Sequence, residues 1–152
     1  MSKLVVDASV VVKWVVSETE SEEAAKLIKA APIAAPDLLI AECANILWKK
    51  VRRKELRADE AFLAARLIER ADIELCPSRN LLETATRVAV ELDHPAYDCI
   101  YLALAELNDW RFVTADGRLL RKLAQPKASP FGTRSMSIED AVRHFQAATR
   151  SG

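Results

Sequence analysis

The sequence has no excess of charge of either sign, which excludes a nucleic-acid binder that works through its overall electrostatic field. Its 152 residues include 22 Lys and Arg and 22 Asp and Glu, so the formal net charge is zero. A polyanionic partner is therefore expected only if the basic residues are segregated on one surface. Hydrophobic residues make up 51% and charged residues 29% of the chain. This balance is typical of a globular protein and excludes a disordered one.

Cysteines are few, and long apolar runs are missing. Cys43, Cys76 and Cys99 stand far apart with no CxxC pair, which excludes a disulfide framework or a zinc knuckle and indicates buried thiols in a reducing compartment. The apolar N-terminal stretch is interrupted by Asp7 and Lys13, unlike a signal peptide. No run reaches the roughly 18 apolar residues of a membrane span. We therefore expect a cytoplasmic protein that does not contact a membrane.

Histidine and aromatic residues are also scarce. The two histidines, His94 and His144, are isolated in the sequence, and we predict caps or surface positions for them rather than metal ligation. Aromatic residues make up 6% of the chain. We predict that Trp14, Trp48 and Trp110 serve as core or interface residues rather than as platforms for base stacking. No cluster of His or Cys therefore competes for a soft metal ion.

Short apolar runs alternate with helical patterns along the chain. We predict strands at 4–7, 33–35, 73–76 and 111–114, and helices at 10–16, 21–31, 59–70, 81–92, 96–108 and 117–123, a further long helix after Asp37, and an amphipathic tail over 137–149. Ser9 is the predicted N-cap of the first helix. Short strands alternating with helices imply a mainly parallel sheet covered on both faces. We expect one α/β domain over residues 1–152, folded as a three-layer α/β/α sandwich.

Two acidic residues follow predicted strands. Asp7 comes directly after LVV, and Asp116 follows RFVTA. A carboxylate in such apolar surroundings is costly unless something pairs with it. In parallel sheets, ligands gather outside the carboxyl ends of strands, at the point where strand order reverses. The alternative is that Asp7 is a turn or capping residue before Ser9, and that Asp116 caps a helix beginning at Gly117.

Two further acids lie on helices that are otherwise nearly uncharged. Glu42 stands in PDLLIAECAN, where Asn45 is three residues on and shares its face, and Asp98 stands in the first turn of the helix predicted at 96–108. Each alone can be explained as a partner of a helix dipole. If all four acids converge, however, their mutual repulsion demands a cation. Ligation by oxygen alone selects hard ions such as Mg²⁺ or Mn²⁺.

The basic residues are segregated into two groups. The first group is Lys49, Lys50, Arg52, Arg53, Lys54 and Arg57, and the second is Arg118, Arg121, Lys122, Lys127 and Arg134. The second group adjoins Asp116, so we predict that Arg118, Arg121 and Lys122 contact RNA phosphates. The first group lies at the far end of the predicted Glu42 helix, where a solvated helix tail is the alternative.

Four stretches together carry a family resemblance. They are LVVDASVVVKWV, APDLLIAECANILW, HPAYDCIYLALAE and FVTADGRLLRKL. In this order and spacing the sequence resembles the PIN-domain family, and in particular the VapC-type toxins of bacterial and archaeal toxin–antitoxin pairs. The resemblance implies an acidic quartet, with Asp7 and Asp98 as the most direct metal ligands; its members are Asp7, Glu42, Asp98 and Asp116, accompanied by the polar residues Ser9, Asn45 and Thr114. It also implies the strand order 3-2-1-4-5, with a fifth strand near 134–136.

The function that this resemblance implies is metal-dependent endoribonuclease activity. The protein would be the toxin of a VapBC-type pair, would hydrolyse RNA, with a structured RNA such as tRNA as the expected substrate, and would use one or two Mg²⁺ or Mn²⁺ ions. A cognate antitoxin and a homodimer are expected on the same basis.

Two other functions stay open at the level of sequence. The first is a phosphatase or phosphotransferase with Asp7 as its nucleophile, although a haloacid-dehalogenase-type motif would place a second acid where Ser9 stands. The second is a non-catalytic binding module in which the acids only cap helices.

Overall fold

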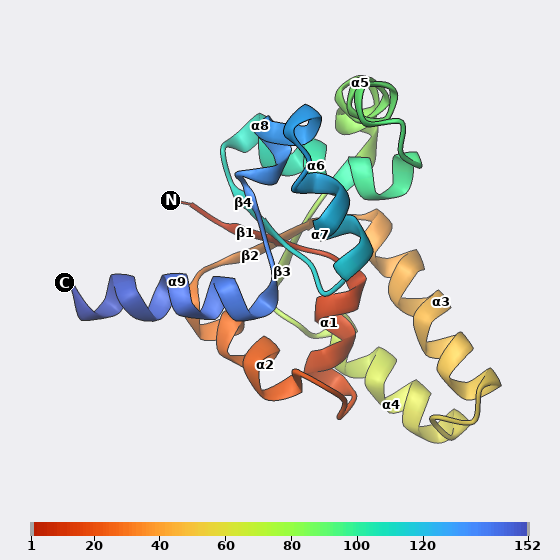
Figure 1. Ribbon diagram of the computed structural model, residues 1–152. Coiled ribbons are helices and arrows are strands. Elements are labelled where there is room, and N and C mark those ends of the chain that lie inside the picture. The colour runs from red at the N-terminus through yellow and green to blue at the C-terminus, as the bar shows by residue number, and fades with distance from the viewer. Residues whose placement is uncertain (1, 152) are drawn as a thin grey trace.

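A parallel sheet with very short strands runs through the middle of the molecule (Figure 1). The computed structural model describes residues 2–151, without the side chain of residue 149, so both end residues of the predicted domain 1–152 lie outside the described part. The strands are β1 (Leu4–Val6), β2 (Ile33–Pro36), β3 (Ile73–Cys76), β4 (Arg111–Val113) and β5 (Ser135–Met136). Their order is β3-β2-β1-β4-β5 and every pairing is parallel. The strand order implied by the resemblance is confirmed.

Helices cover both faces of the sheet and confirm the three-layer α/β/α fold (Figure 1). They are α1 (Ala8–Val15), α2 (Ser21–Ala30), α3 (Leu38–Arg52), α4 (Ala58–Glu69), α5 (Leu82–Leu92), α6 (Ala96–Asn108), α7 (Gly117–Leu123), α8 (Ser129–Gly132) and α9 (Ile138–Arg150), with 3₁₀ turns at Ser78–Leu81 and Pro126–Ala128. Helices α3 and α4 pack on each other and extend beyond the sheet as a pair. In the described part of the chain, every helix is too short or too polar to cross a bilayer.

The core explains why strands of only two to four residues suffice. All three residues of β1 are buried, because helices lie against both faces of this central strand. On one side α6 packs on β1, β2 and β4 through buried residues such as Leu102 and Leu104. On the other side α1 contributes Val10, Val11 and Val12, all less than 2% exposed. Apolar burial on this scale stabilises elements that have little intrinsic helix or strand propensity.

The first helix begins earlier than predicted, and its cap is a different residue. Helix α1 starts at Ala8 with Asp7 as its N-cap, so the prediction that Ser9 is the N-cap is wrong. The reason is that the Asp7 carboxylate accepts a hydrogen bond from the Val10 amide at 3.3 Å. The Ser9 hydroxyl instead donates to the Asp7 carboxylate and accepts a hydrogen bond from the Ala115 amide after β4. Asp37 does occupy the N-cap position of α3, but its carboxylate accepts hydrogen bonds from the Ser78 amide and hydroxyl instead.

Candidate active site

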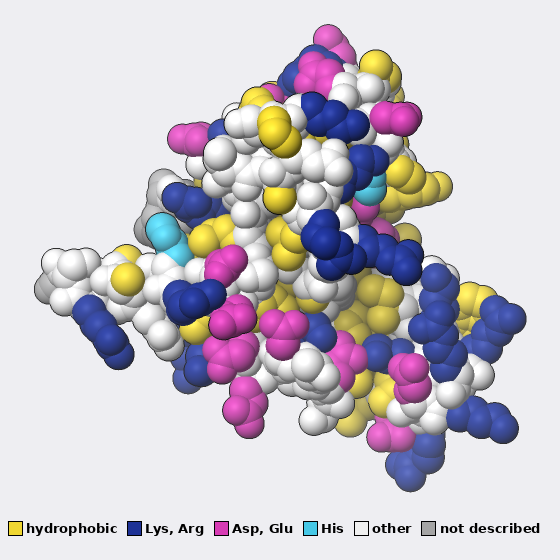
Figure 2. Space-filling view, in the orientation of Figure 1, with side chains coloured by type: hydrophobic (Ala, Val, Ile, Leu, Met, Phe, Trp, Pro, Cys, Tyr) yellow, Lys and Arg dark blue, Asp and Glu magenta, His cyan; other side chains and the backbone are white. Residues whose placement is uncertain are grey.

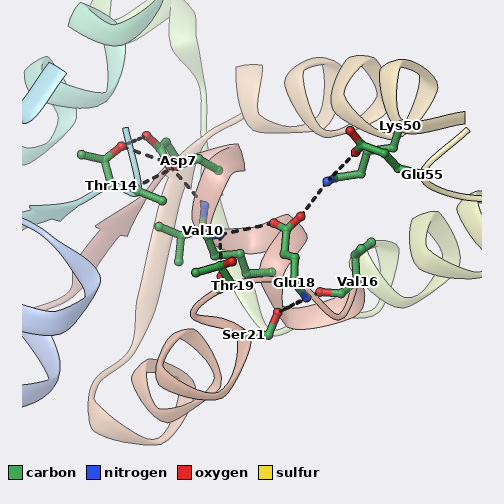
Figure 3. Close-up of polar contacts among 12 residues, drawn as sticks. Asp7, Val10, Val16, Glu18, Thr19, Ser21, Lys50, Glu55 and Thr114 are labelled. Atoms are coloured by element: carbon green, nitrogen blue, oxygen red, sulfur yellow. Dashed lines mark hydrogen bonds and ion pairs between the residues drawn. The ribbon is translucent and has the colours of Figure 1, made fainter. Parts of the chain in front are cut away.

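Asp7 lies at the point where the order of the strands reverses. Strand β1 pairs with β4 in register, with Val6 opposite Val113, so the residues that follow the two strands are neighbours. Asp7 is 7% exposed. Its Oδ1 accepts hydrogen bonds from the Ser9 hydroxyl and the Val10 amide, and its Oδ2 accepts one from the Thr114 hydroxyl (Figure 3). Every one of these donors fixes the orientation of the carboxylate.

The hydroxyls of Ser9 and Thr114 connect Asp7 to the turn after β4. Thr114 is fully buried and its Oγ1 accepts a hydrogen bond from the Asp116 amide at 3.1 Å. The Ser9 Oγ accepts one from the Ala115 amide at 3.0 Å. The backbone that carries Asp116 is therefore fastened to the carboxylate of Asp7 through two hydroxyl groups.

Burial makes Asp7 an unusual carboxylate. It raises the pKa of Asp7 from 3.8 to about 6, against the opposing effect of the hydrogen bonds from Ser9 and Thr114, and the negative charge of Asp98 raises it further. An ionised Asp7 is therefore costly in this environment, and its polar neighbours offset only part of the cost. A cation beside it would remove the rest.

Glu42 and Tyr101 meet inside the molecule from two different helices. Glu42 is half-buried on α3, and its Oε1 and the Tyr101 hydroxyl oxygen are both buried without a hydrogen-bond partner among the described residues. Burial raises the pKa of Glu42, the nearby Tyr101 hydroxyl lowers it, and the charge of Asp98 raises it. Burial and Glu42 also raise the pKa of Tyr101, so its hydroxyl stays protonated. Glu42 thus has an acceptor oxygen to which none of the described residues donates a hydrogen bond.

Asp98 is the third residue of α6 and is held by a histidine. Its Oδ2 lies 2.7 Å from Nε2 of His94, and their side chains are 32% and 16% exposed respectively. His94 stands alone among histidines in the sequence, but in the fold its ring has two side-chain partners, Asp98 and Lys122. The i,i+4 spacing was visible in the sequence, but His94 precedes the helix, and its ring direction is set by a contact with α7. Nδ1 of His94 lies 3.2 Å from Nζ of Lys122.

Asp116 is the exposed member of the predicted quartet. Its Oδ1 accepts hydrogen bonds from the amides of Arg118 at 3.0 Å and Leu119 at 3.2 Å, so it is the N-cap of α7. The capping alternatives for Asp7 and Asp116 are therefore both correct as descriptions of local structure. Capping does not compete with a role in a site, because each carboxylate keeps oxygen lone pairs beyond the bonds it accepts. Asn45, predicted to accompany Glu42, lies exposed on α3.

The acids fit a hard divalent cation in donor type and in charge. As the side chains lie, no three His, Cys, Asp or Glu residues within the described range 2–151 are close enough together to hold a metal ion. Asp98 nevertheless raises the pKa of both Asp7 and Glu42, so these three acids share one electrostatic environment. Glu42 also has an unsatisfied oxygen there. Oxygen donors with uncompensated negative charge are what Mg²⁺ and Mn²⁺ bind.

The neighbouring thiols do not compete for this role. Burial, followed by the charges of Glu42 and Asp7, raises the pKa of Cys43 to about 12. Burial and the charge of Asp98 raise that of Cys99 to about 11. Both thiols are therefore protonated at neutral pH, whereas a metal ligand or nucleophile must be a thiolate. The prediction of buried free thiols is confirmed for these two, while Cys76 is half-buried.

Positively charged side chains gather over α7 and over the C-terminal half of α3, with hydrophobic side chains between them (Figure 2). Not all of them are free. Lys50 is 16% exposed and pairs with Glu18 at 2.6 Å and Glu55 at 3.4 Å (Figure 3). Lys122 is half-buried and donates to the Asp93 carbonyl at 2.7 Å. Arg118 and Arg121 are exposed.

Comparison with known proteins identifies the family. The model of the PIN domain matches residues 4–125, which include all four predicted acids. The chain belongs to the PIN-domain family. Ribonuclease VapC3 of Pyrobaculum aerophilum is 34% identical to this PIN-domain chain over 126 residues, covering 79% of the chain and 94% of that protein. Ribonuclease VapC9 of Mycobacterium tuberculosis is 32% identical over 116 residues, covering 76% and 87% respectively.

A solved structure agrees with the fold of this PIN domain. The crystal structure of PAE2754 from Pyrobaculum aerophilum superposes with a TM-score of 0.71 at 26% sequence identity, covering 96% of this chain and 90% of that one. The PIN domain described here adds two residues that the sequence reasoning missed, His94 and Tyr101. A buried tyrosine usually requires a polar partner, and that was the available signal for Tyr101.

Proposed function

We propose that this PIN domain is a divalent-metal-dependent endoribonuclease and the toxin of a VapBC-type toxin–antitoxin pair. The observation that carries the proposal is the shared electrostatic environment of Asp7, Glu42 and Asp98, which come from the end of β1, from α3 and from α6: the charge of Asp98 raises the pKa of the other two acids. An RNA backbone cannot approach such a site unless a metal ion inverts its potential. The related VapC proteins are named ribonucleases.

Asp7, Glu42, Asp98 and Asp116 are the residues that would hold one or two Mg²⁺ or Mn²⁺ ions. When bound, such ions lower the pKa of water and stabilise the charge that develops on a phosphodiester during hydrolysis. The chain itself supplies orientation. Ser9 and Thr114 hold the carboxylate of Asp7, and the Tyr101 hydroxyl lies near Glu42 and lowers its pKa. The Thr114 hydroxyl accepts a hydrogen bond from the Asp116 amide and so holds the turn that carries Asp116.

The surface that would contact the RNA phosphates lies on α7. Arg118 and Arg121 are exposed in the two turns after Asp116, whereas the ammonium group of Lys122 is engaged with Asp93 and His94. Replacing both arginines by glutamine should raise KM for an RNA oligonucleotide several-fold with little change in kcat. It should also lower the slope of the logarithm of the binding constant against the logarithm of the salt concentration, by the equivalent of about one to two phosphate contacts.

Steady-state cleavage kinetics at several salt concentrations check this prediction. Lys29→Gln removes an exposed charge from α2 and serves as the control. An equal loss in the control, or a loss confined to kcat, would contradict a phosphate-contact role for α7.

A protein partner is part of the same proposal. The resemblance implies a cognate antitoxin and a homodimer, and both stay predictions. The exposed apolar side chains of Phe62, Leu63 and Leu67 on α4 support such a partner, because monomeric proteins rarely leave contiguous apolar patches exposed.

Metal-dependent cleavage of RNA tests the catalytic proposal directly. The purified protein, freed of any bound partner, should cleave total RNA with Mg²⁺ or Mn²⁺ and lose that activity in excess chelator. Asp98→Asn should reduce the rate by at least about a hundredfold, as expected for a group that stabilises transition-state charge. Asp109→Asn, at the opposite end of α6 and paired with Arg134, should leave the rate unchanged.

The same assay separates the alternatives. Equal cleavage with and without chelator would overturn the metal-dependent proposal. Release of phosphate from small esters without RNA cleavage would favour a phosphatase with Asp7 as nucleophile. No activity and no measurable metal binding would favour a binding module.

A further inference from the structure

A lysine and a histidine form a hydrogen-bonded chain that ends on Asp98. Nζ of Lys122 on α7 donates to the Asp93 carbonyl at 2.7 Å and lies 3.2 Å from Nδ1 of His94. Nε2 of the same ring lies 2.7 Å from Oδ2 of Asp98 on α6. The imidazole is 16% exposed, so its contacts are largely shielded from water. Three segments of the chain thus meet at one side chain.

The direction of these hydrogen bonds follows from the chemistry of the end groups. An ammonium group has only donors, so Nδ1 of His94 must accept from Lys122. An ionised carboxylate has only acceptors, so Nε2 must carry a proton and donate a hydrogen bond to Asp98. Lys122 therefore selects the tautomer that can hold Asp98.

We propose that His94 is a positioning residue for the metal-binding carboxylate of Asp98, and that Lys122 fixes the tautomer in which His94 does so. The inference rests on the proposed function, because Asp98 matters in this way only if it meets a divalent cation. Ligating carboxylates are themselves held by hydrogen bonds, and loss of such a partner typically costs about 10- to 100-fold in metal affinity or activity.

The negative charges of the site explain why the Asp98 carboxylate has to be held in place. Asp98 is one-third exposed, and its charge raises the pKa of both Asp7 and Glu42. An unrestrained carboxylate would turn toward water and away from the other two acids. The Nε2 donor holds one oxygen of Asp98 and leaves the other available. Through Lys122, the same chain links the helix that begins after Asp116 to the N-terminal turn of α6.

Metal binding is the primary measurement, with Mn²⁺ as the probe because its EPR signal reports binding without any turnover. His94→Ala should weaken the Mn²⁺ affinity about 10- to 100-fold. His94→Gln places an amide N–H near the position of Nε2 and should restore most of that loss. His144→Ala, which removes the other histidine of the chain from an exposed position on α9, should bind Mn²⁺ as the wild type does.

The tautomer of His94 can be measured by spectroscopy. Loss of Lys122 would not change it if Lys122 had a merely structural role. With two histidines in the chain, the ring nitrogens of His94 can be assigned in a ¹H–¹⁵N NMR spectrum by comparison with His144→Ala. The wild type should show the Nε2–H form, and Lys122→Met should populate the other tautomer. In Mn²⁺ affinity, Lys122→Met should add little to the loss already caused by His94→Ala, since both act through the same hydrogen bond.

Three results would overturn the positioning role. They are an unchanged Mn²⁺ affinity in His94→Ala, a His94→Gln variant as impaired as the alanine variant, and fully additive effects of the two substitutions. Circular dichroism of each variant establishes that it is folded. If the wild type binds Mn²⁺ but cleaves no RNA, the ribonuclease proposal fails while the His94 comparison still decides this inference. If the wild type binds no Mn²⁺, both fail.

Discussion

Replacing Asp7 by asparagine is expected to abolish RNA cleavage and, at the same time, to make the metal-free protein more stable. Cleavage should fall by at least about a thousandfold, because a carboxylate that holds a catalytic cation contributes several kcal/mol of charge stabilisation. Stability should rise because the ionised Asp7 is buried at a cost that asparagine does not carry. The asparagine oxygen can still accept from Ser9 and Val10, as Oδ1 of Asp7 does.

The sign of the stability effect follows from the direction of the pKa shift. The folded-state pKa of Asp7, about 6, lies above the ordinary aspartate value of 3.8, which applies to the unfolded chain. The folded state therefore binds the proton more tightly, and this contribution to stability is fully present below pH 3.8 and is lost as the pH rises through about 6. A shift of this size means that ionisation of Asp7 lowers the free energy of unfolding by about 3 kcal/mol at neutral pH.

Thermal unfolding in chelator at two pH values measures this effect. At pH 7.5, Asp7→Asn should unfold roughly 5–10 °C above the wild type, since about 1 kcal/mol moves Tm by about 2–4 °C in a domain of this size. At pH 4 the two proteins should unfold at nearly the same temperature. Asp109→Asn alters an exposed carboxylate and should match the wild type at both pH values. A less stable Asp7→Asn at pH 7.5 would contradict the burial cost.

Adding Mn²⁺ is expected to remove most of the difference in stability between the two proteins. An ion bound at the proposed site would offset the negative charge of Asp98, which raises the pKa of both Asp7 and Glu42. At about 100 times its dissociation constant, a ligand that binds only the folded state stabilises it by about 2.7 kcal/mol. The Tm of the wild type should therefore rise by roughly 5–10 °C. Asp7→Asn, which lacks one of the proposed ligands, should show little of this rise.

The control for the Mn²⁺ experiment is a monovalent salt at matched ionic strength, because screening alone also weakens repulsion between exposed charges. A rise in Tm of equal size with the monovalent salt would show that the acids do not form a site. An equal rise with Mn²⁺ in the wild type and in Asp7→Asn would place the ion elsewhere. Asp7→Asn should therefore unfold at the higher temperature in chelator, and the two proteins should unfold at similar temperatures in Mn²⁺.

The positions of the secondary-structure elements were largely predictable from local pattern. Strand β3 and helices α6 and α7 have the predicted bounds to the residue, because Pro, Asn and Gly residues and changes in hydrophobic period mark their ends. The placement of Asp7 and Asp116 after β1 and β4 follows from the same pattern. The fifth strand, β5, has only two residues. Its sequence carried too little periodicity to reveal it, and only the family resemblance predicted it.

The contacts of the site were not predictable in the same way. The hydroxyl of Thr114 meets Asp7 across a separation of 107 residues, and Lys122 meets His94 across 28. Glu42 and Tyr101 lie near each other although their helices, α3 and α6, are distant in the sequence. The spacing of residues along one helix or strand predicts none of these contacts, because each depends on how the elements pack around the sheet.

The sequence alone determined the alternation of strands and helices, and the four acids that stand in apolar surroundings, because burial imposes a local pattern on both. The tertiary structure decided what each acid touches: Asp7 is a buried cap held by two hydroxyls, Glu42 has an unsatisfied oxygen, and Asp98 is held by His94. Parallel strands require long crossover connections, so the groups that meet at their carboxyl ends come from distant parts of the chain. The electrostatic coupling of the acids arises from that convergence.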